Sequence, residues 1–256
     1  MTWISGVPEA GWARRGNLRA VRGCVREWDE TCPGTSNLLI HAALAAALVA
    51  APLTSGSPAS ALRLARLHYG GGGDWYANPT SLPNLAKALE KRLGVAVSVE
   101  EGRVSPLDEE LFDYPILHMT GHGNVRFTSE EAERLRWYLI HGGFLFADDN
   151  YGMDESFRRE IRKVFPEAEL VEIPFDHEIY HSVYEFREGL PKIHEHHGGR
   201  PRGYGIFHEG RLVVFYSHNT DIGDGLEDAD VHDDPPAVRE RALQMALNVV
   251  AYAMTH

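Results

Sequence analysis

Residues 128–150, TSEEAERLRWYLIHGGFLFADDN, constrain the fold most strongly, because their pattern predicts a helix, a tight stop and a buried strand. Thr128 and Glu131 have the spacing of a capping box, in which a hydroxyl and a carboxylate each satisfy a backbone N–H at a helix start. The glycines at 142–143 end the helix where a left-handed residue needs no Cβ. The apolar run 144–147 predicts a strand covered by helices on both faces.

Three polar residues, Asp148, Asp149 and Asn150, follow this strand. Ligands of open α/β sheets bind outside the carboxyl ends of the strands, so this is the expected position of a site. Adjacent residues on an extended strand point to opposite faces, and we expect at most one of the two acids to reach a cleft unless the backbone turns there. The other acid is expected to cap a helix or anchor a loop.

Residues 62–256 alternate short apolar runs with amphipathic segments, which is typical of an α/β domain with a mostly parallel sheet. No repeat or linker divides them, so one domain is expected. Besides 144–147, the expected strands are 62–69, 95–99, 115–120, 168–173 and a hairpin of 205–208 with 212–216. Besides the helix that begins after Thr128, helices are expected to end at Leu93, to run from an Asp154 N-cap through Val164, and to run from Pro236 to Met254.

An apolar run at residues 38–52, LLIHAALAAALVAAP, precedes this domain. It is shorter than the about 20 apolar residues that span a bilayer, and it has the length of a signal-peptide core. Ala59 and Ala61 supply the small residues of a cleavage site. We therefore expect residues 1–61 to be a leader cleaved near residue 61, a true start downstream of Met1, and export to the periplasm or cell envelope without a transmembrane span in the mature chain. The alternative is an ordinary helix of a cytosolic protein.

The charge and the cysteine content of the chain argue against certain partners and certain kinds of site. The formal net charge of −12 argues against nucleic acid or an anionic membrane as a partner, because phosphate contacts need clustered Lys and Arg. The chain has two cysteines, Cys24 and Cys32, and both lie in the expected leader. The mature chain is therefore expected to have no disulfide, no cysteine metal site and no cysteine nucleophile.

Residue types that contact ligands follow several of the expected strands, as glycines, aromatic rings, carboxylates, imidazoles and amides. Because the carboxyl ends of parallel strands share one edge, we expect these residues to meet around one cleft. The glycines after the first strand fit neither a G-x-G-x-x-G register nor a P-loop, so they support no nucleotide site, and a flexible turn is the alternative. The predicted ligand-binding residues are Gly72, Gly73, Asp74, Trp75, Tyr76, Gly121, His122, Gly123, Asp148, Asp149, Asn150, His218 and Asn219.

A histidine pair, His177 and His181, matches the H-E-x-x-H pattern in which a helix holds a catalytic zinc ion. Pro174 lies three residues before the first histidine, and no long apolar-periodic helix surrounds the motif. The pair is therefore a weak candidate for a metal site.

A second histidine group consists of His194, His196 and His197 around a glutamate. These rings could gather a transition metal, although a surface loop is the preferred interpretation. The acidic residues 221–234 lack the spacing of an EF-hand, and we expect them to be solvated. A divalent metal is thus possible, and no cofactor is certain.

Five stretches together resemble one known family. They are 69–76 (YGGGGDWY), 111–115 (LFDYP), 120–123 (TGHG), 142–149 (GGFLFADD) and the pair Asp176-His177. In this order, over about residues 64–253, they resemble the domain of unknown function 4159 (DUF4159) family. The resemblance implies a place in the class I glutamine amidotransferase-like superfamily, near the ThuA-like proteins of sugar utilisation. It also implies a flavodoxin-like three-layer sandwich, often exported or membrane-tethered in bacteria, with no established activity.

The sequence departs from the amidotransferase relatives at the catalytic position. Those proteins place a cysteine at a strand-to-helix elbow, whereas the comparable strand end here carries Asp148, Asp149 and Asn150. Glutamine hydrolysis through a thioester is therefore not expected.

Three functions remain open at the sequence level. The preferred one is a non-catalytic module that binds a small, carbohydrate-like molecule through aromatic rings and carboxylates. The alternative is a hydrolase in which Asp148 and Asp149 serve as base and electrostatic partner, with His122 or His218 as the acid. In another form of this alternative these groups, with or without His177 and His181, hold a divalent metal. The third is a module that binds protein partners in the envelope.

Overall fold

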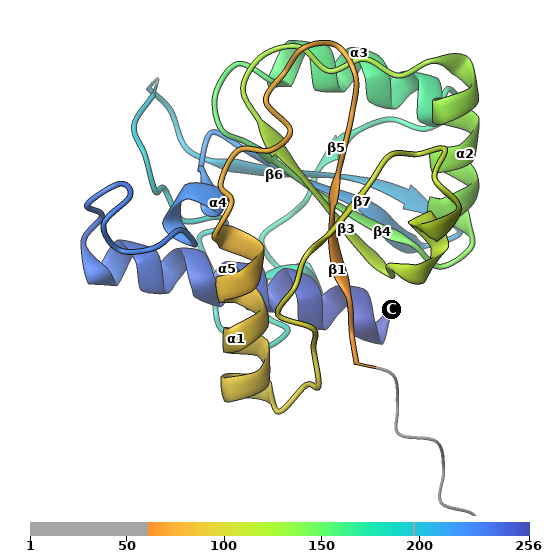
Figure 1. Cartoon of the computed structure of the whole chain (residues 1–256). Helices are drawn as coiled ribbons and strands as arrows, with labels where there is room; N and C mark the ends of the chain where they lie inside the picture. The colour runs from red at the N-terminus through yellow and green to blue at the C-terminus, as the bar shows by residue number, and fades with distance from the viewer. Residues whose placement is uncertain (1–60, 197) are drawn as a thin grey trace, which may run out of the picture. The chain divides into compact units, whose positions relative to one another are not determined.

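The computed structural model describes residues 61–196 and 198–256, so the expected leader lies outside the described residues except for Ala61 (Figure 1). One sheet has the strand order β2-β1-β3-β4-β7-β6-β5. Its strands are β1 (Leu64–Leu67), β2 (Gly102–Val104), β3 (Ile116–Gly121), β4 (Phe144–Asp149), β5 (Val171–Glu172), β6 (Arg202–His208) and β7 (Arg211–His218). Strands β2, β1, β3, β4 and β7 are parallel, whereas β6 pairs antiparallel with both β7 and β5. The expected α/β fold with a mostly parallel sheet is confirmed.

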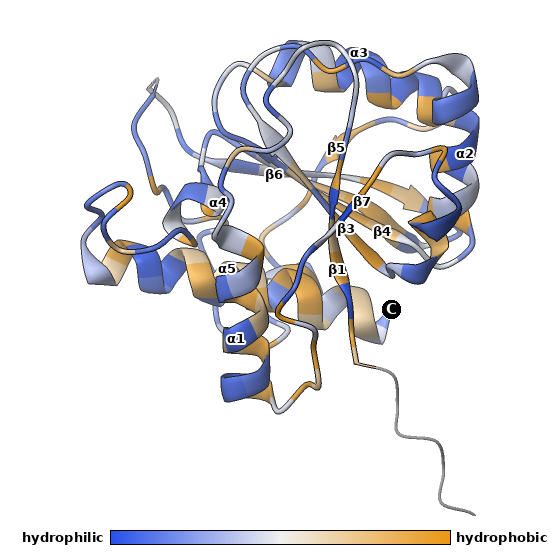
Figure 2. Cartoon of the chain, viewed as in Figure 1, coloured by the Kyte–Doolittle hydropathy of each residue, from blue (hydrophilic) through white to orange (hydrophobic). Residues whose placement is uncertain are grey.

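Helices cover both faces of the sheet. They are α1 (Ser81–Leu93), α2 (Ser129–Ile140), α3 (Asp154–Val164), the short α4 (Ile222–Gly225) and α5 (Pro236–Thr255). Figure 1 shows α2 and α3 on one side of the sheet and α1 and α5 on the other. Strand β4 serves both sides, since Leu145 packs in the core under α2 and α3 while Phe144 and Phe146 pack in the core under α1 and α5. Figure 2 shows the hydrophobic strands at the centre and mostly hydrophilic residues between α4 and α5.

Helix α2 and strand β4 form as the sequence predicts. The Thr128 hydroxyl accepts a hydrogen bond from the backbone N–H of Glu131, and the Glu131 carboxylate accepts one from the backbone N–H of Thr128. Gly142 then adopts a φ of +110°. At Gly143 a Cβ would lie 2.3 Å from the Tyr138 ring, so the aromatic side chain closes on the backbone there.

The hairpin of β6 and β7 is confirmed as well. Glu209 and Gly210 connect the strands with φ values of 50° and 84°. Two successive residues with positive φ give a turn whose twist matches that of the strands. The turn fixes β6 as an antiparallel addition to the parallel strands.

The sequence-based strand at residues 95–99 is wrong. Within this segment only Val97 forms a bridge, to Leu62 just before β1, and Val99 is 42% exposed. The edge position beside β1 belongs to β2, where Gly102 lies under the Tyr114 ring and a Cβ would come within 2.3 Å of it. Apolar alternation alone does not show which of two short edge segments continues the ladder.

Two further boundaries differ from expectation. The strand expected at 168–173 is reduced to β5, whose two residues are exposed at the sheet edge. The N-cap of α3 is Met153, and Asp154 is the first helical residue. The Asp154 carboxylate accepts hydrogen bonds from Arg158 and Tyr216 instead of capping the helix.

Among the helices of the described residues, none has both the length and the apolar character that crossing a membrane requires.

Candidate functional site

The strands β1, β3, β4 and β7 end at one side of the sheet, which we call the carboxyl edge. In the parallel ladders Gly121 lies opposite Asp149, and Asp148 lies opposite Ser217. The loop after β1 folds against the turn after β3, where Gly73 donates a backbone hydrogen bond of 3.1 Å to Asn124. The turns that follow these four strands therefore meet, although they are distant in the sequence.

Asp148 is fully buried on the side of the sheet that carries α4. Its carboxylate accepts hydrogen bonds from the Ser217 hydroxyl, from the backbone N–H of Gly223 at 2.6 Å and from that of Ile222 at 3.3 Å. Burial raises the pKa of Asp148 to about 7, against the effect of these donors. The side chain therefore anchors the start of α4 and has no access to solvent.

Asp149 points to the opposite side of the sheet, as the alternation along a strand requires. One carboxylate oxygen accepts backbone hydrogen bonds from Tyr151 at 3.1 Å and Met153 at 3.0 Å, at the start of α3. The other lies 4.0 Å from Nε2 of His218, which is also 3.8 Å from Asp154. Asp149 therefore fixes the β4–α3 turn and sets the surroundings of His218.

Asn150 belongs to a buried amide network that the sequence analysis missed. Its amide nitrogen donates to Asn78 at 2.6 Å and to Asp224 at 2.8 Å, and its amide oxygen accepts from Thr120 at 2.9 Å. Asn78 in turn donates to Asp224 at 2.5 Å. The network joins the loops after β1, β3 and β4 to α4, and only the three-dimensional fold reveals it because Asn78 and Asp224 lie 146 positions apart.

Asp74 and His122 form an accessible pair at the carboxyl edge. Nδ1 of His122 lies 2.9 Å from the Asp74 carboxylate, which also accepts a hydrogen bond from the His122 backbone N–H. Burial acts to raise the pKa of Asp74, but the hydrogen bonds from His122 outweigh it and lower that pKa. Gly121 permits this contact, because a Cβ there would lie 2.9 Å from the Asp74 carbonyl oxygen and 3.0 Å from its carboxylate.

Aromatic rings lie beside this pair. Trp75 is half-buried and packs on His68 with ring centroids 4.2 Å apart, and its edge contact with Tyr76 spans 5.6 Å. Tyr76 is 62% exposed. Tyr151, which the sequence analysis did not select, is 52% exposed and stacks on His196 at 4.9 Å. Tyr151 directly follows the polar residues at the end of β4, and this position in the sequence could have identified it as a candidate site residue.

The predicted ligand-binding residues thus separate into two groups by burial. Asn219, for example, is buried and accepts a hydrogen bond from Lys192. The buried group contains Gly121, Asp148, Asp149, Asn150 and Asn219. The exposed or partly exposed group contains Gly72, Gly73, Asp74, Trp75, Tyr76, His122, Gly123 and His218. The second group offers side chains and backbone to a ligand, whereas the first holds the edge together.

Histidines and acids also converge around α4. The ligand atoms of His194, His196 and Asp221 lie within 4.8 Å of one another, and so do those of His194, Asp224 and His232. Imidazole and carboxylate are ligands of several divalent metals, so the geometry of each group suits such an ion. The third histidine of the sequence motif, His197, lies outside the described residues.

The expectation that residues 221–234 are solvated is wrong for three of the acids. Asp221, Asp224 and Glu227 are at most 8% exposed. Glu227 accepts hydrogen bonds from the backbone and hydroxyl of Thr80, and Asp224 joins the amide network. Burial and the neighbouring Asp148 raise the pKa of Asp221 to about 9. Loop composition did not predict this burial, because the partners come from other parts of the chain.

The H-E-x-x-H pair lies away from these groups. Residues Glu178–Tyr180 form a single 3-10 turn, and a ring nitrogen of His177 accepts a hydrogen bond from the backbone of Ile179. Nε2 of His181 lies 2.7 Å from the carbonyl of Phe175, and its Nδ1 lies 3.1 Å from Glu185. In the described part of the chain, neither ring belongs to a converging set of three potential metal ligands.

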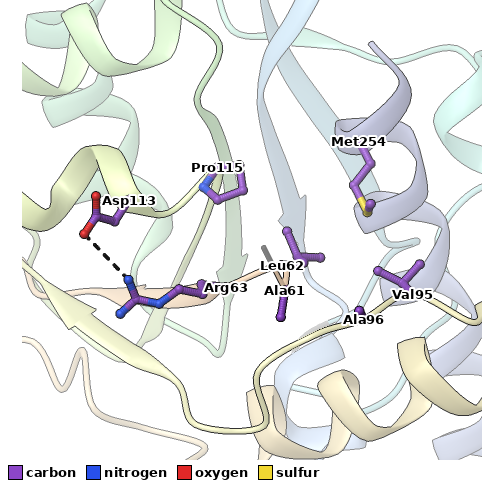
Figure 3. A pocket seen from close by; sticks show the side chains of 8 residues that line it. All are labelled: Ala61, Leu62, Arg63, Val95, Ala96, Asp113, Pro115 and Met254. Carbon is purple, nitrogen blue, oxygen red and sulfur yellow. Dashed lines mark ion pairs between the residues drawn. The ribbon is translucent and has the colours of Figure 1, made fainter. Parts of the chain in front are cut away.

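A pocket of about 620 Å³ lies at the amino ends of β1 and β3 (Figure 3). An ion pair of 3.6 Å between Arg63 and Asp113 borders it, and Met254 of α5 lines it on another side. None of the predicted ligand-binding residues lines this pocket. It belongs to the sheet edge opposite to the one that carries the candidate residues.

Comparison with known proteins finds no match among curated proteins. A family model does match, over residues 63–254, which include all strands from β1 to β7 and most of the chain. Its description is "Domain of unknown function (DUF4159)", and the chain belongs to this family.

Proposed function

We propose that this chain is an exported domain of the bacterial cell envelope that binds a small, carbohydrate-like molecule at the carboxyl edge. The observation that carries the proposal is the position of the Asp74–His122 pair between the ends of β1 and β3. The chain passes from β1 to β2 on one side and then to β3 on the other, so the connections diverge at this point. Ligands of open α/β sheets bind at such a switch point.

The proposed superfamily relationship agrees with this position. The parallel strands follow the order β2-β1-β3-β4-β7, which corresponds to the 2-1-3-4-5 order of flavodoxin-like folds. This order supports the amidotransferase-like, ThuA-like assignment that the sequence motifs suggest. The antiparallel β6 and β5 extend the sheet beyond that shared part.

The chemistry of the exposed side chains favours a sugar. An apolar sugar face packs on an aromatic ring, and its hydroxyls need paired donors and acceptors. Tyr76 and Trp75 supply rings, while Asp74 and His122 supply an acceptor and a donor beside them. The burial of Asp148 and Asp149 favours binding over catalysis by these two acids, because both are engaged in holding loops.

A hydrolase is the second candidate, and one observation favours it. Asp74 engages Nδ1 of His122, and half of the His122 side chain is exposed. A carboxylate that orients an imidazole in this way prepares the other ring nitrogen to accept a proton from water or from a substrate hydroxyl. In this alternative His122 is the base, and His218 lies farther along the same edge.

Calorimetry with a panel of neutral and acidic oligosaccharides, in buffer that contains a chelator, tests the proposed function. We expect Tyr76→Ala and His122→Ala to weaken binding by about tenfold or more, a loss of about 1.4 kcal/mol. Trp137→Ala is the matched control, because Trp137 is a half-exposed aromatic residue of α2 that stacks on His141. If no sugar binds, or if all three variants bind as the wild type does, the carbohydrate proposal is rejected. Turnover of chromogenic esters or glycosides that His122→Ala abolishes would support the hydrolase instead.

A further inference from the structure

His194 is at the centre of a set of potential metal ligands beside α4. Its Nδ1 lies 3.0 Å from a carboxylate oxygen of Asp224 and 3.5 Å from one of Asp221. That Asp221 oxygen also contacts Nε2 of His196, and the Asp224 oxygen lies 3.8 Å from Nε2 of His232. We call these five residues, His194, His196, Asp221, Asp224 and His232, the histidine cluster.

The two converging groups of the cluster cannot each hold an ion through the same nitrogen atom. They share His194, and in both groups the atom of His194 that faces the acids is Nδ1. A neutral imidazole nitrogen has a single lone pair and coordinates one metal ion. The second ring nitrogen is engaged elsewhere, because Nε2 lies 3.1 Å from both carboxylate oxygens of Asp234.

An independent observation indicates a missing partner. The Asp221 side chain is 1% exposed, and its Oδ1 has no hydrogen-bond partner among the described residues. A buried polar oxygen without a partner is costly, because the hydrogen bonds to water that it loses on burial are not replaced. The other oxygen of the same carboxylate points at His196 and His194, so the group is directed into the cluster. A cation bound at Oδ2 would give this buried side chain an electrostatic partner.

The residues around the cluster orient the ligands in the manner of established metal sites. Metal-bound histidines donate their second ring N–H to a carboxylate or carbonyl, and Asp234 occupies that position behind His194. The second oxygen of Asp224 accepts hydrogen bonds from the amides of Asn78 and Asn150, which hold this carboxylate in place. Tyr151 stacks on the His196 ring.

We propose that the histidine cluster binds one divalent transition-metal ion, of which Zn²⁺ is the representative. Mixed imidazole and carboxylate ligands suit Zn²⁺ and its neighbours, whereas Mg²⁺ and Ca²⁺ prefer oxygen ligands alone. The ligands come from the segment before β6, from α4 and its start, and from the loop between α4 and α5. None of the five ligands is among the residues proposed to contact the sugar, so the site goes beyond the proposed sugar binding and does not depend on it.

Titration of the metal-stripped full chain with Zn²⁺ tests the proposal. Cys24→Ser and Cys32→Ser form the background of every protein, so that these thiols do not bind zinc. We expect one ion per chain, and binding at least about 100-fold weaker in His194→Ala and in His196→Ala. Asp234→Asn is expected to weaken binding by about 10-fold to 100-fold, since it removes only the support of His194. His181→Ala is the matched control, a histidine with a carboxylate partner outside the cluster, and it should bind zinc as the background does.

Two results would overturn the proposal that the histidine cluster binds a metal ion. One is zinc binding that His194→Ala and His196→Ala leave unchanged, and the other is no stoichiometric binding by the background protein. X-ray absorption of the zinc-loaded background protein gives a readout that needs no cluster variant to fold. It should show a nitrogen and oxygen shell at about 2.0–2.1 Å with imidazole scattering, and a shell without imidazole contradicts the proposal.

Discussion

Nδ1 of His122 lies 2.9 Å from the carboxylate of Asp74, although 48 positions separate the two residues. This contact holds the loop after β1 against the turn after β3. It lies where the connections of the sheet diverge, with exposed aromatic rings next to it. The pair therefore links the topology of the sheet to the proposed ligand site.

Asp74→Asn should destabilise the protein more at pH 7 than at pH 3. The folded-state pKa of Asp74 is lowered, so its stabilising contribution is present above the ordinary value of 3.8 and is lost as the pH falls through the folded-state pKa. Near neutral pH we expect a cost of about 1 kcal/mol from the weakened hydrogen bonds to His122. Urea unfolding at both pH values measures the difference. An equal cost at pH 7 and pH 3 contradicts the assigned role of the charge.

His118→Phe should stabilise the protein. His118 is buried on β3 against Phe146, and both its ring nitrogens are without a hydrogen-bond partner in the described part of the chain. Burial, with a contribution from Arg66, lowers its pKa to about 3. Phenylalanine fills a similar volume without the polar atoms, so we expect a gain of about 1–3 kcal/mol at pH 7.

The same substitution should change the pH dependence of stability. Because the folded-state pKa of His118 is below the unfolded value of 6.5, its contribution is fully present above pH 6.5 and is lost as the pH falls towards 3. At pH 5 the advantage of His118→Phe should be larger than at pH 7 by about 2 kcal/mol. Denaturant unfolding at the two pH values is the measurement, and an advantage that shrinks at pH 5 contradicts the assignment.

Gly121→Ala should cost more than Gly142→Ala. Both glycines have positive φ, at 136° and 110°, so both substitutions strain the backbone. At Gly121 the new methyl group would also lie 2.4 Å from the Tyr69 hydroxyl, whereas nothing lies within 4 Å at Gly142. We expect a loss of about 1–2 kcal/mol at Gly142 and at least about 3 kcal/mol at Gly121. Thermal and chemical unfolding of the two variants compare the costs, and equal losses would show that the contact with Tyr69 relaxes freely.

The sequence predicted those parts of the fold that local rules determine. Helix α2 followed from Thr128, Glu131 and the glycines after it, and β4 followed from an uninterrupted apolar run. The β6–β7 hairpin followed from the turn at Glu209 and Gly210. Edge segments were harder, because residues 95–99 and β2 compete for one position beside β1 and differ mainly in how they pack.

The candidate site was only partly predictable for a similar reason. The placement of His122 and Asp149 at one edge follows from the rule that parallel strands end together. The histidine cluster does not follow from such a rule. Its contacts span 25 positions between His196 and Asp221 and 40 between His194 and Asp234, and the order of β6, β7 and α4 brings them together. The acids around α4 looked solvated in the sequence because their composition resembles that of a surface loop.

Amide NMR titration of the full chain with the oligosaccharides tests the central claim that the carboxyl edge is the ligand site. The account predicts shifts at residues 72–76, 121–123 and at Tyr151, with none around the pocket of Figure 3 that Ala61 and Met254 line. Shifts concentrated at that pocket, or no shifts with any sugar at millimolar concentration, would contradict it.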